Sequence, residues 1–380
     1  MELMPNSNSL VTDTSGAGFL DLTDINKKYG NVTALKKLNL KLNKGEILSI
    51  LGPSGAGKTT ILKIIAGLEN VQSGKIVFKN KIINNIEPKD RNFAMVFETY
   101  ALYPHISVFE NLASPLNALR MNKEEIKEKV EKIASILGMK PYLDRKPANL
   151  SGGQRQRVAL GRALVKPAEL YLMDEPIAHL DAKLRFQMTA EFKNLQSRLN
   201  ISIIYVTHDW REALSLGDHV IVLNNGEIEQ YGSSEEVFYN PANTFVSQIV
   251  GDPPMNLIPG KIKKRDNATS LKLNGINIDL NKFNVSLGND QNIILGIRPN
   301  KILIDEESKE NINAEVYSIE KYGVNTIVSL KISDLIIKIK YKGRADFKIG
   351  EVVKVTIDLN DSCLFGEDNK LIQTLGRNCG

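Results

Sequence analysis

The sequence has very little cysteine: among 380 residues only Cys363 and Cys379 carry thiols, and there is a single tryptophan. Two thiols form neither a disulfide framework nor a cysteine-rich zinc site, so a reducing compartment is expected. Long apolar runs are also missing, which excludes a membrane-spanning helix, and no hydrophobic signal segment opens the chain. We therefore expect any role at a membrane to depend on a partner protein.

An excess of one charge sign is missing too, because the formal net charge is only +5, and aromatic residues make up 6%. A basic surface with interleaved aromatic side chains is typical of nucleic-acid binding. Its absence from the C-terminal region argues against an oligonucleotide partner, and we expect none. The remaining composition, 42% hydrophobic and 24% charged, is ordinary for a globular chain of two or three domains.

Three regions differ in pattern. Residues 1–18 are rich in Ser, Asn, Thr and Gly, which predicts a flexible tail. In residues 19–250, apolar runs alternate with helical periodicity, which predicts an α/β domain on a parallel sheet, with a helical subdomain at about 99–165. Residues 251–380 begin with a Pro-rich linker and continue as short alternating segments, which predict a small all-β barrel or sandwich.

Several elements can be predicted individually. Residues 19–25 alternate as a strand does, and residues 27–32 are expected to form a turn-like break. Asn122 is placed to cap an amphipathic helix over residues 122–137. In the C-terminal region the predicted strands are Ser270–Leu273, Ile293–Ile297, Asn313–Val316, Thr326–Ile332, Leu335–Lys340 and Val352–Ile357.

The most informative stretch reads G-P-S-G-A-G-K-T-T and matches the phosphate-binding loop G-x-x-x-x-G-K-T. It lies between an apolar run suited to a buried strand, 46–51, and a helical pattern, 61–68. Glycines let backbone N–H groups turn toward a phosphate, and the helix N-terminus adds partial positive charge. The alternative is a chance glycine-rich turn. The predicted nucleotide-binding residues are Gly52, Pro53, Ser54, Gly55, Ala56, Gly57, Lys58, Thr59 and Thr60.

This loop implies a nucleoside triphosphate and Mg²⁺ as ligands. Lys58 is expected to reach the β- and γ-phosphates, and the Thr59 hydroxyl to hold the metal ion. Asp174 and Glu175 end a later buried run, and parallel strands bring such ends to the same sheet edge. Asp174 suits the metal and Glu175 the base that deprotonates the attacking water. A solvated strand end is the alternative interpretation of this acidic pair.

A second motif runs from Leu150 to Arg157 as L-S-G-G-Q-R-Q-R. A serine and two glycines at a helix start offer a hydroxyl and free N–H groups to an anion. An ordinary serine N-cap with glycines in the turn is the alternative. The stretch resembles the signature motif of the ATP-binding-cassette (ABC) ATPases, and together with the phosphate loop it marks that family with high specificity.

The resemblance extends over residues 19–372 and is closest to the ATPase subunits of importers for sugars, such as the maltose and glycerol-phosphate systems. It is carried by the segments 100–105 (YALYPH), 180–185 (LDAKLR), 251–256 (GDPPMN) and 296–299 (GIRP). The implied fold is an α/β P-loop ATPase domain with a helical subdomain, followed by a small all-β OB-like (TOBE-type) domain. The β domain is expected to pair with its twin and to have a regulatory role.

The same resemblance implies roles for further residues. Tyr29 is expected to stack on adenine and His208 to contact the γ-phosphate, although plain packing or a solvated strand end would explain each residue by itself. Asp181 is expected at a dimer interface. Ser151 and Gly153, with Gln154, would serve the nucleotide held by the opposite subunit of a head-to-tail dimer.

Two positions depart from the family pattern. Glu98 stands where the family has Gln; its oxygen could still ligate Mg²⁺, but its charge near the triphosphate is expected to weaken ATP binding. His179 stands where small polar residues are common; it could titrate at a dimer interface, or simply be packed or solvated. These departures motivate the hypothesis of a heterodimer beside that of a homodimer.

The predicted function is the ATP-hydrolysing subunit of an importer for a sugar or glycerol-phosphate-like solute. Expected partners are a second ATPase subunit, two transmembrane permease subunits that contact the loop at 100–108, and indirectly an extracytoplasmic solute-binding protein. The expected location is the cytoplasmic face of the membrane. A polyamine, metal or anion importer is the alternative. A soluble ABC ATPase is less favoured, since the chain has one phosphate loop and no coiled-coil insert.

Overall fold

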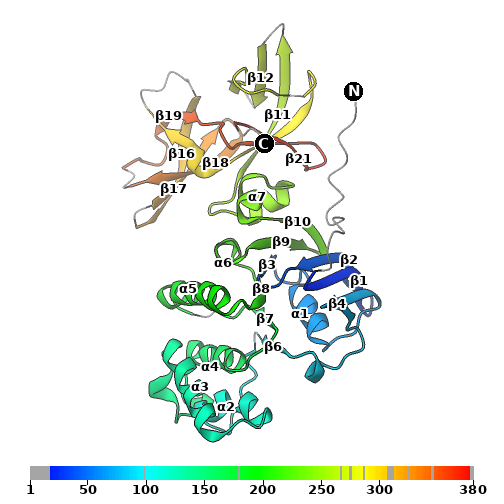
Figure 1. Ribbon diagram of the computed structural model, residues 1–380. Coiled ribbons are helices and arrows are strands. Elements are labelled where there is room, and N and C mark those ends of the chain that lie inside the picture. The colour runs from blue at the N-terminus through cyan, green and yellow to red at the C-terminus, as the bar shows by residue number, and fades with distance from the viewer. Residues whose placement is uncertain are drawn as a thin grey trace. The chain divides into compact units, whose positions relative to one another are not determined.

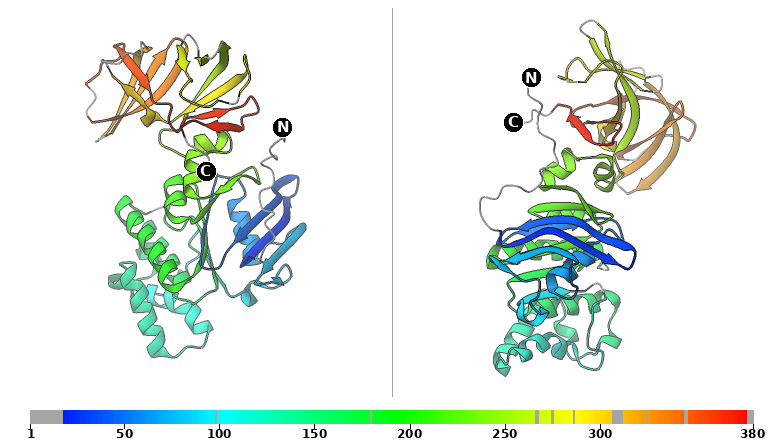
Figure 2. Two further views of the ribbon diagram at one scale, coloured as in Figure 1. Left: turned by 45° about the horizontal axis from the view of Figure 1, so that its top comes forward. Right: turned by 90° about the vertical axis from the view of Figure 1, so that its right-hand side faces the viewer.

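The structure is a computed structural model that describes residues 18–97, 99–178, 180–265, 268–273, 276–285, 287–305, 312–323, 325–343 and 346–376, without the side chains at 195 and 199. The chain divides into two compact units, Met1–Ser234 and Glu235–Gly380. Figures 1 and 2 trace the elements of each unit. Apart from Gly18, the predicted tail lies outside the described residues.

A six-stranded sheet in the order β10-β9-β3-β8-β7-β6 organises the first unit. Its strands β6, β7, β8, β3 and β9 pair in parallel, and β10 closes the sheet as an antiparallel hairpin with β9. The predicted parallel sheet is therefore confirmed. The strands are β3 (Ile47–Leu51), β6 (Phe93–Val96), β7 (Leu170–Asp174), β8 (Ser202–Thr207), β9 (His219–Asn224) and β10 (Glu227–Gly232).

Both faces of this sheet are covered, as expected for a parallel sheet. Alternate residues of β3, β7 and β8 pack on one side against α1 and a smaller antiparallel sheet, and on the other against α4, α5 and α6. The smaller sheet has the order β2-β1-β4-β5, with β1 (Leu20–Tyr29), β2 (Val32–Leu42), β4 (Ser73–Phe78) and β5 (Lys81–Ile82). Since β3, β7 and β8 are parallel neighbours in this sheet, their carboxyl ends lie at the same edge.

The predicted break at 27–32 is wrong, because β1 continues to Tyr29 and only Gly30 and Asn31 turn. Lys27 can lie in the strand although it is buried: its ammonium donates to Glu69 at 2.8 Å and to the Asn70 carbonyl at 2.7 Å. A buried cation that keeps its partners is compatible with a strand interior.

Helices α2, α3 and α4 pack on one another and form the helical subdomain at the end of the first unit (Figure 1). α3 confirms the helix predicted at 122–137, and the Asn122 side chain accepts a hydrogen bond from the Glu125 N–H. The helices of this unit are α1 (Lys58–Ala66), α2 (Val108–Ala118), α3 (Lys123–Ile136), α4 (Gly152–Leu164), α5 (Ala182–Leu199) and α6 (Trp210–Leu216). Single 3₁₀ turns lie at Pro88–Asp90, Lys140–Tyr142 and Pro147–Asn149.

The second unit contains two antiparallel sheets that share one apolar core, which confirms the predicted all-β region. One sheet has the order β13-β12-β11-β14-β20-β21 and the other β15-β19-β16-β17-β18. The strands are β11 (Asn256–Arg265), β12 (Ala268–Leu273), β13 (Ile276–Asp279), β14 (Asn292–Ile297), β15 (Ile302–Ile304), β16 (Ile312–Tyr322), β17 (Asn325–Ile332), β18 (Leu335–Lys342), β19 (Val352–Ile357), β20 (Cys363–Phe365) and β21 (Leu371–Thr374). A 3₁₀ turn lies at Pro299–Lys301.

The division between the units precedes the predicted boundary at 250–251. The segment from this division to the predicted boundary carries α7 (Ser234–Tyr239) and α8 (Thr244–Ile249), and hydrogen bonds connect it to the β region of the second unit. The buried Arg298 donates to the carbonyls of Ser247, at 3.2 Å, and of Phe238 and Val250. Burial lowers the pKa of Arg298 to about 10. This guanidinium attaches both short helices to the β region of the same unit.

Candidate functional site

The phosphate loop joins the end of β3 to the start of α1, as its motif predicts. Gly57 precedes the helix with φ +106°, and no side chain caps the N-terminus of α1. In contrast, helices α2 to α5 are each capped by a side chain, from Ser107, Asn122, Ser151 and Asp181. The first N–H groups of a helix need partners from outside it. At α1 no side-chain cap provides one, and the positive end of the helix dipole favours an anion there.

Lys58 is the first residue of α1 and is buried. Its ammonium donates to the carbonyls of Gly52 and Pro53, at 2.9 Å each, and so lies over the loop. It also lies 3.9 Å from a carboxylate oxygen of Glu175. A cation is thereby held between the phosphate loop and the carboxylate of Glu175, which follows β7.

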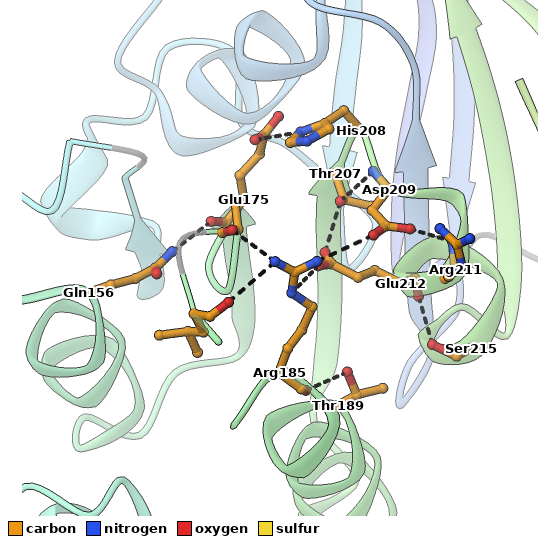
Figure 3. A network of polar contacts seen from close by, with 12 residues as sticks. Gln156, Glu175, Arg185, Thr189, Thr207, His208, Asp209, Arg211, Glu212 and Ser215 are labelled. Carbon is orange, nitrogen blue, oxygen red and sulfur yellow. Dashed lines mark hydrogen bonds and ion pairs between the residues drawn. The ribbon is translucent and has the colours of Figure 1, made fainter. Parts of the chain in front are cut away.

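Glu175 and His208 follow the neighbouring parallel strands β7 and β8. The His208 Nδ1 lies 2.8 Å from the second carboxylate oxygen of Glu175, within hydrogen-bond distance (Figure 3). The His208 ring is largely exposed, whereas the Glu175 side chain is mostly buried. Three side chains named from sequence, Lys58, Glu175 and His208, therefore meet at one edge of the sheet.

The backbone of Glu175 is in the left-handed region, with φ +47°, which is costly for a residue other than glycine. Its conformation is held from both sides. The Glu175 N–H donates to the carbonyl of Val206 at 3.0 Å, and its carbonyl accepts from the Gln156 amide at 3.2 Å. Hydrogen bonds to the Glu175 main chain thus fix the direction of its carboxylate.

A polar network lies beside this pair (Figure 3). Arg185 of α5 contacts Asp209 at 3.5 Å and Glu212 at 3.6 Å. Glu212 also accepts hydrogen bonds from the hydroxyls of Tyr205, at 2.9 Å, and Thr207, at 2.8 Å. Burial is the largest cause that raises the pKa of Glu212. It also raises the pKa of Tyr205 far above its ordinary value.

The residues present fit Mg²⁺ held in part by substrate oxygens. Asp174 ends β7 almost completely buried, and Thr59 is the second residue of α1. Within the described ranges, no group of three or more His, Cys, Asp or Glu side chains could hold a metal ion. Mg²⁺ in phosphate sites takes one or two carboxylates and completes its shell with phosphate oxygens and water. One carboxylate and one hydroxyl are donors of that kind.

The signature stretch forms the N-terminus of α4 and has a local role there. The Ser151 hydroxyl accepts from the Gln154 N–H at 3.3 Å, and the Gln154 side chain accepts from the Ser151 N–H at 2.8 Å. This is a capping box. Ser151 is exposed and Gly153 half-buried, so their predicted contact with a second subunit's nucleotide remains a prediction.

Tyr29 ends β1 with its ring 42% exposed. The Lys27 ammonium lies 4.9 Å from the ring centroid. The exposed aromatic side chain is compatible with the predicted stacking on adenine, which stays a prediction. Asp181 caps α5 by accepting from the Leu184 N–H. The predicted residues Glu98 and His179 lie outside the described residues.

Sequence reasoning missed four residues around Glu175. Gln156 and Arg185 both stood inside motifs that carried the resemblance, but their spacing does not show what they contact. Asp209 and Glu212 follow His208 directly, and Asp209 caps α6. Only the fold brings α4 and α5 to the ends of β7 and β8.

Comparison with known proteins agrees with these observations. The family model described as ABC transporter matches residues 35–178, and the one described as MalK OB fold domain matches residues 251–302. The trehalose/maltose import ATP-binding protein MalK of Thermococcus litoralis is 39% identical, over 90% of this chain and 96% of that protein. The sn-glycerol-3-phosphate import ATP-binding protein UgpC of Ruegeria pomeroyi is 44% identical, over 81% and 85% respectively.

Solved structures resemble the first unit. A dimeric ATP-binding cassette in a post-hydrolysis state, bound to ADP and phosphate, is 31% identical, with a TM-score of 0.53 over 57% of this chain and 98% of that one. Within the part of the chain that the structure describes, no helix is long and apolar enough to cross a membrane. The chain belongs to the ATP-binding-cassette family, among the import ATP-binding proteins that hydrolyse ATP to drive transport and carry a MalK-type OB-fold domain.

Proposed function

We propose that Lys58, Glu175 and His208 form the hydrolytic centre at which this chain cleaves ATP. The observation that carries the proposal is their juxtaposition: Glu175 lies 3.9 Å from the Lys58 ammonium and 2.8 Å from the His208 ring. A carboxylate at the end of β7 faces the phosphate loop across the edge of the sheet. Phosphoryl transfer depends mainly on positioning and charge stabilisation, which this set provides.

In this scheme the α1 N-terminus and Lys58 bind the β- and γ-phosphates. Glu175 accepts a proton from the attacking water, whose oxygen forms the new bond to the γ-phosphorus as the bond to ADP breaks. His208 donates a hydrogen bond to the Glu175 carboxylate and orients it. The left-handed backbone of Glu175 fixes the direction of that carboxylate before the water arrives.

Thr59 and Asp174 would hold Mg²⁺, which when bound neutralises charge on the phosphate oxygens. Glu98 is proposed as a third oxygen ligand. Tyr29 is proposed to stack on the adenine, a contact worth about 1–3 kcal/mol for a base on an aromatic ring. Of the other loop residues, Ser54, Gly55, Ala56 and Thr60 are proposed to contribute backbone N–H groups or a hydroxyl to the phosphates.

We further propose that the site is completed by a second copy. The exposed α4 N-terminus, with Ser151, Gly153 and Gln154, would close over the nucleotide held by the partner's phosphate loop. Two solved cassettes that resemble the first unit are described as dimeric. The permease subunits would contact residues 100–108 at the cytoplasmic face of the membrane, and a solute-binding protein would act through them.

The transported solute is proposed to be a sugar or a glycerol-phosphate-like compound, because the relatives reported above are named for trehalose, maltose and sn-glycerol-3-phosphate. A polyamine, metal or anion remains the alternative cargo. Thermal-shift screening of the cognate binding protein against these classes separates them. Stabilisation by a polyamine, metal or inorganic anion, and by no sugar or sugar phosphate, would refute the proposed cargo.

The hydrolytic proposal is tested with Glu175→Gln. The amide keeps the shape of the side chain but cannot accept the proton, so we expect turnover to fall about 10²- to 10⁴-fold. Binding of a fluorescent ATP analogue should persist, since Lys58 and α1 are unchanged. A variant that hydrolyses ATP at the wild-type rate would contradict the role given to Glu175.

A further inference from the structure

In Figure 3, Arg185 contacts two segments besides its own helix. It lies on α5, in the first turns after Asp181. Its guanidinium contacts the loop that follows β7 and, on its other side, the segment that follows β8. These are the two segments that carry Glu175 and His208.

The contacts toward the β7 loop are hydrogen bonds to main-chain carbonyls. The Arg185 Nη2 donates to the carbonyl of Ala178 at 3.1 Å and to that of Leu180 at 3.3 Å. These acceptors are uncharged main-chain carbonyls. Whether the hydrogen bonds form therefore depends on the directions in which the guanidinium N–H groups point. These two bonds fix the loop three and five residues beyond Glu175.

The contacts toward the β8 segment are ion pairs. Arg185 Nη1 lies 3.5 Å from an Asp209 carboxylate oxygen, and its Nε lies 3.6 Å from Glu212. Asp209 is the residue after His208, and it also caps α6 by accepting from the Arg211 N–H at 2.8 Å. The position of Asp209 is therefore fixed by a helix as well as by Arg185.

These contacts close a ring through two loops. The ring runs from the Glu175 carboxylate to His208, through Asp209 to the Arg185 guanidinium, and back along the loop main chain to Glu175. β7 and β8 are adjacent parallel strands, and the Glu175 N–H already donates to the Val206 carbonyl of β8. Arg185 ties together the far ends of the loops that follow these strands.

We propose that Arg185 is a positioning residue for ATP hydrolysis: by holding the carbonyls of Ala178 and Leu180 and the carboxylate of Asp209 at once, it keeps Glu175 and His208 in hydrogen-bond contact. The inference rests on the roles proposed above for those two residues. It predicts that Arg185 acts on the rate of the chemical step and leaves nucleotide binding at the phosphate loop unchanged.

The chemistry calls for arginine at this position. A guanidinium presents several N–H donors in a rigid fork, whereas a lysine ammonium is a compact charge on a flexible stem. Lysine can restore the charge facing Asp209 and Glu212 but cannot donate to both loop carbonyls in the same geometry. Arg185→Lys therefore separates charge compensation from loop positioning.

The test measures steady-state ATP hydrolysis, nucleotide binding and hydrogen–deuterium exchange for Arg185→Lys and Arg185→Ala. In both variants we expect kcat to fall roughly 10- to 100-fold, as for a displaced catalytic group, with KM within about twofold. In nucleotide-free protein, exchange should rise in Pro176–Ala178 and Thr207–Asp209. Arg185→Lys should unfold near the wild-type temperature.

Thr189→Ala is the matched control, because its hydroxyl donates only to the Arg185 carbonyl on the same helix, at 2.9 Å. It should leave kcat and loop exchange unchanged. If alanine at 185 prevents folding by stranding the buried Glu212, the double variant Arg185→Ala/Glu212→Gln removes that charge.

Three results would overturn the proposal. The first is a wild-type kcat in Arg185→Lys. The second is a loss of nucleotide binding in parallel with turnover, with faster hydrogen–deuterium exchange throughout the first unit. The third is a lower kcat without faster exchange in the two loops. The exchange measurement needs no catalysis. A failure of the roles given to Glu175 and His208, seen as wild-type turnover in Glu175→Gln, is thus distinguishable from a failure of the inference.

Discussion

Alanine substitutions at Gly55 and Gly57 should have unequal costs, although both glycines lie in the phosphate loop and both have positive φ, +80° and +106°. A Cβ at Gly55 would meet nothing within 4 Å. A Cβ at Gly57 would lie 2.7 Å from the Ala34 carbonyl and 3.0 Å from the Leu35 side chain. The pair therefore separates backbone strain from steric conflict within one loop.

The magnitudes follow from these two terms. A left-handed conformation costs a residue other than glycine about 1–2 kcal/mol, which is the whole cost expected for Gly55→Ala. Overpacking adds about 1–3 kcal/mol, so Gly57→Ala should lose about 2–5 kcal/mol in total. The conflict is with main chain from β2, which cannot rotate away as a flexible side chain would.

The assay is urea unfolding without nucleotide, followed by fluorescence of Trp210. It is the only tryptophan in the sequence and lies in α6 of the first unit, so the signal reports that unit. Omitting nucleotide keeps binding from contributing to stability. Equal free energies of unfolding for the two variants, or a more stable Gly57→Ala, would refute this reasoning.

Four further predictions concern single side chains. Arg91 donates to the carbonyls of Ile64 and Ile65 at the end of α1, and of Ile86; Arg91→Leu should lower the free energy of unfolding by about 2–4 kcal/mol, and urea unfolding at the wild-type midpoint would contradict this. Burial raises the pKa of Glu212 above its ordinary 4.5, so the folded state binds that proton more tightly and stability should fall as pH rises from 4.5 through the folded value. Glu212→Gln should lack this component, and identical pH slopes of stability for both proteins would count against it. Burial raises the pKa of Cys363 to about 11; in Cys379→Ser the remaining thiol should react with Ellman's reagent only after unfolding, whereas rapid reaction of folded protein would disprove its burial. Tyr29→Ala should weaken ATP binding by roughly 5- to 100-fold without lowering stability, and unchanged affinity would remove Tyr29 from the site.

Much of the fold could be predicted from local signals. The phosphate loop lies between a recognisable strand and helix. The apolar run of β7 leads to Asp174, and that of β8 leads to His208. Parallel strands share a carboxyl edge, so the meeting of Lys58, Glu175 and His208 could be anticipated. These inferences depend on residues close in sequence or on one general rule of sheet topology.

What could not be predicted depends on contacts between distant segments. Lys27 is a charged, buried residue in a strand, and its bonds to Glu69 and to the Asn70 carbonyl explain why β1 does not stop there. Arg298 attaches α7 and α8 to the β region through carbonyls far along the chain. The ring through Arg185 likewise needs α5 to lie beside two strand ends. No periodicity or motif spacing contains that information.

The central claim is that each site is completed by the α4 N-terminus of a second chain, and Gly152→Asp tests it most directly. A Cβ at Gly152 would meet nothing within 4 Å. A carboxylate in the first turn of α4 interacts favourably with the positive end of the helix dipole. We expect Gly152→Asp to be stable and to bind ATP with wild-type affinity. Combined with Glu175→Gln, it should not form ATP-dependent dimers, as judged by light scattering. With Glu175 present, it should not hydrolyse ATP. ATP-dependent dimers and wild-type turnover in Gly152→Asp would contradict the account.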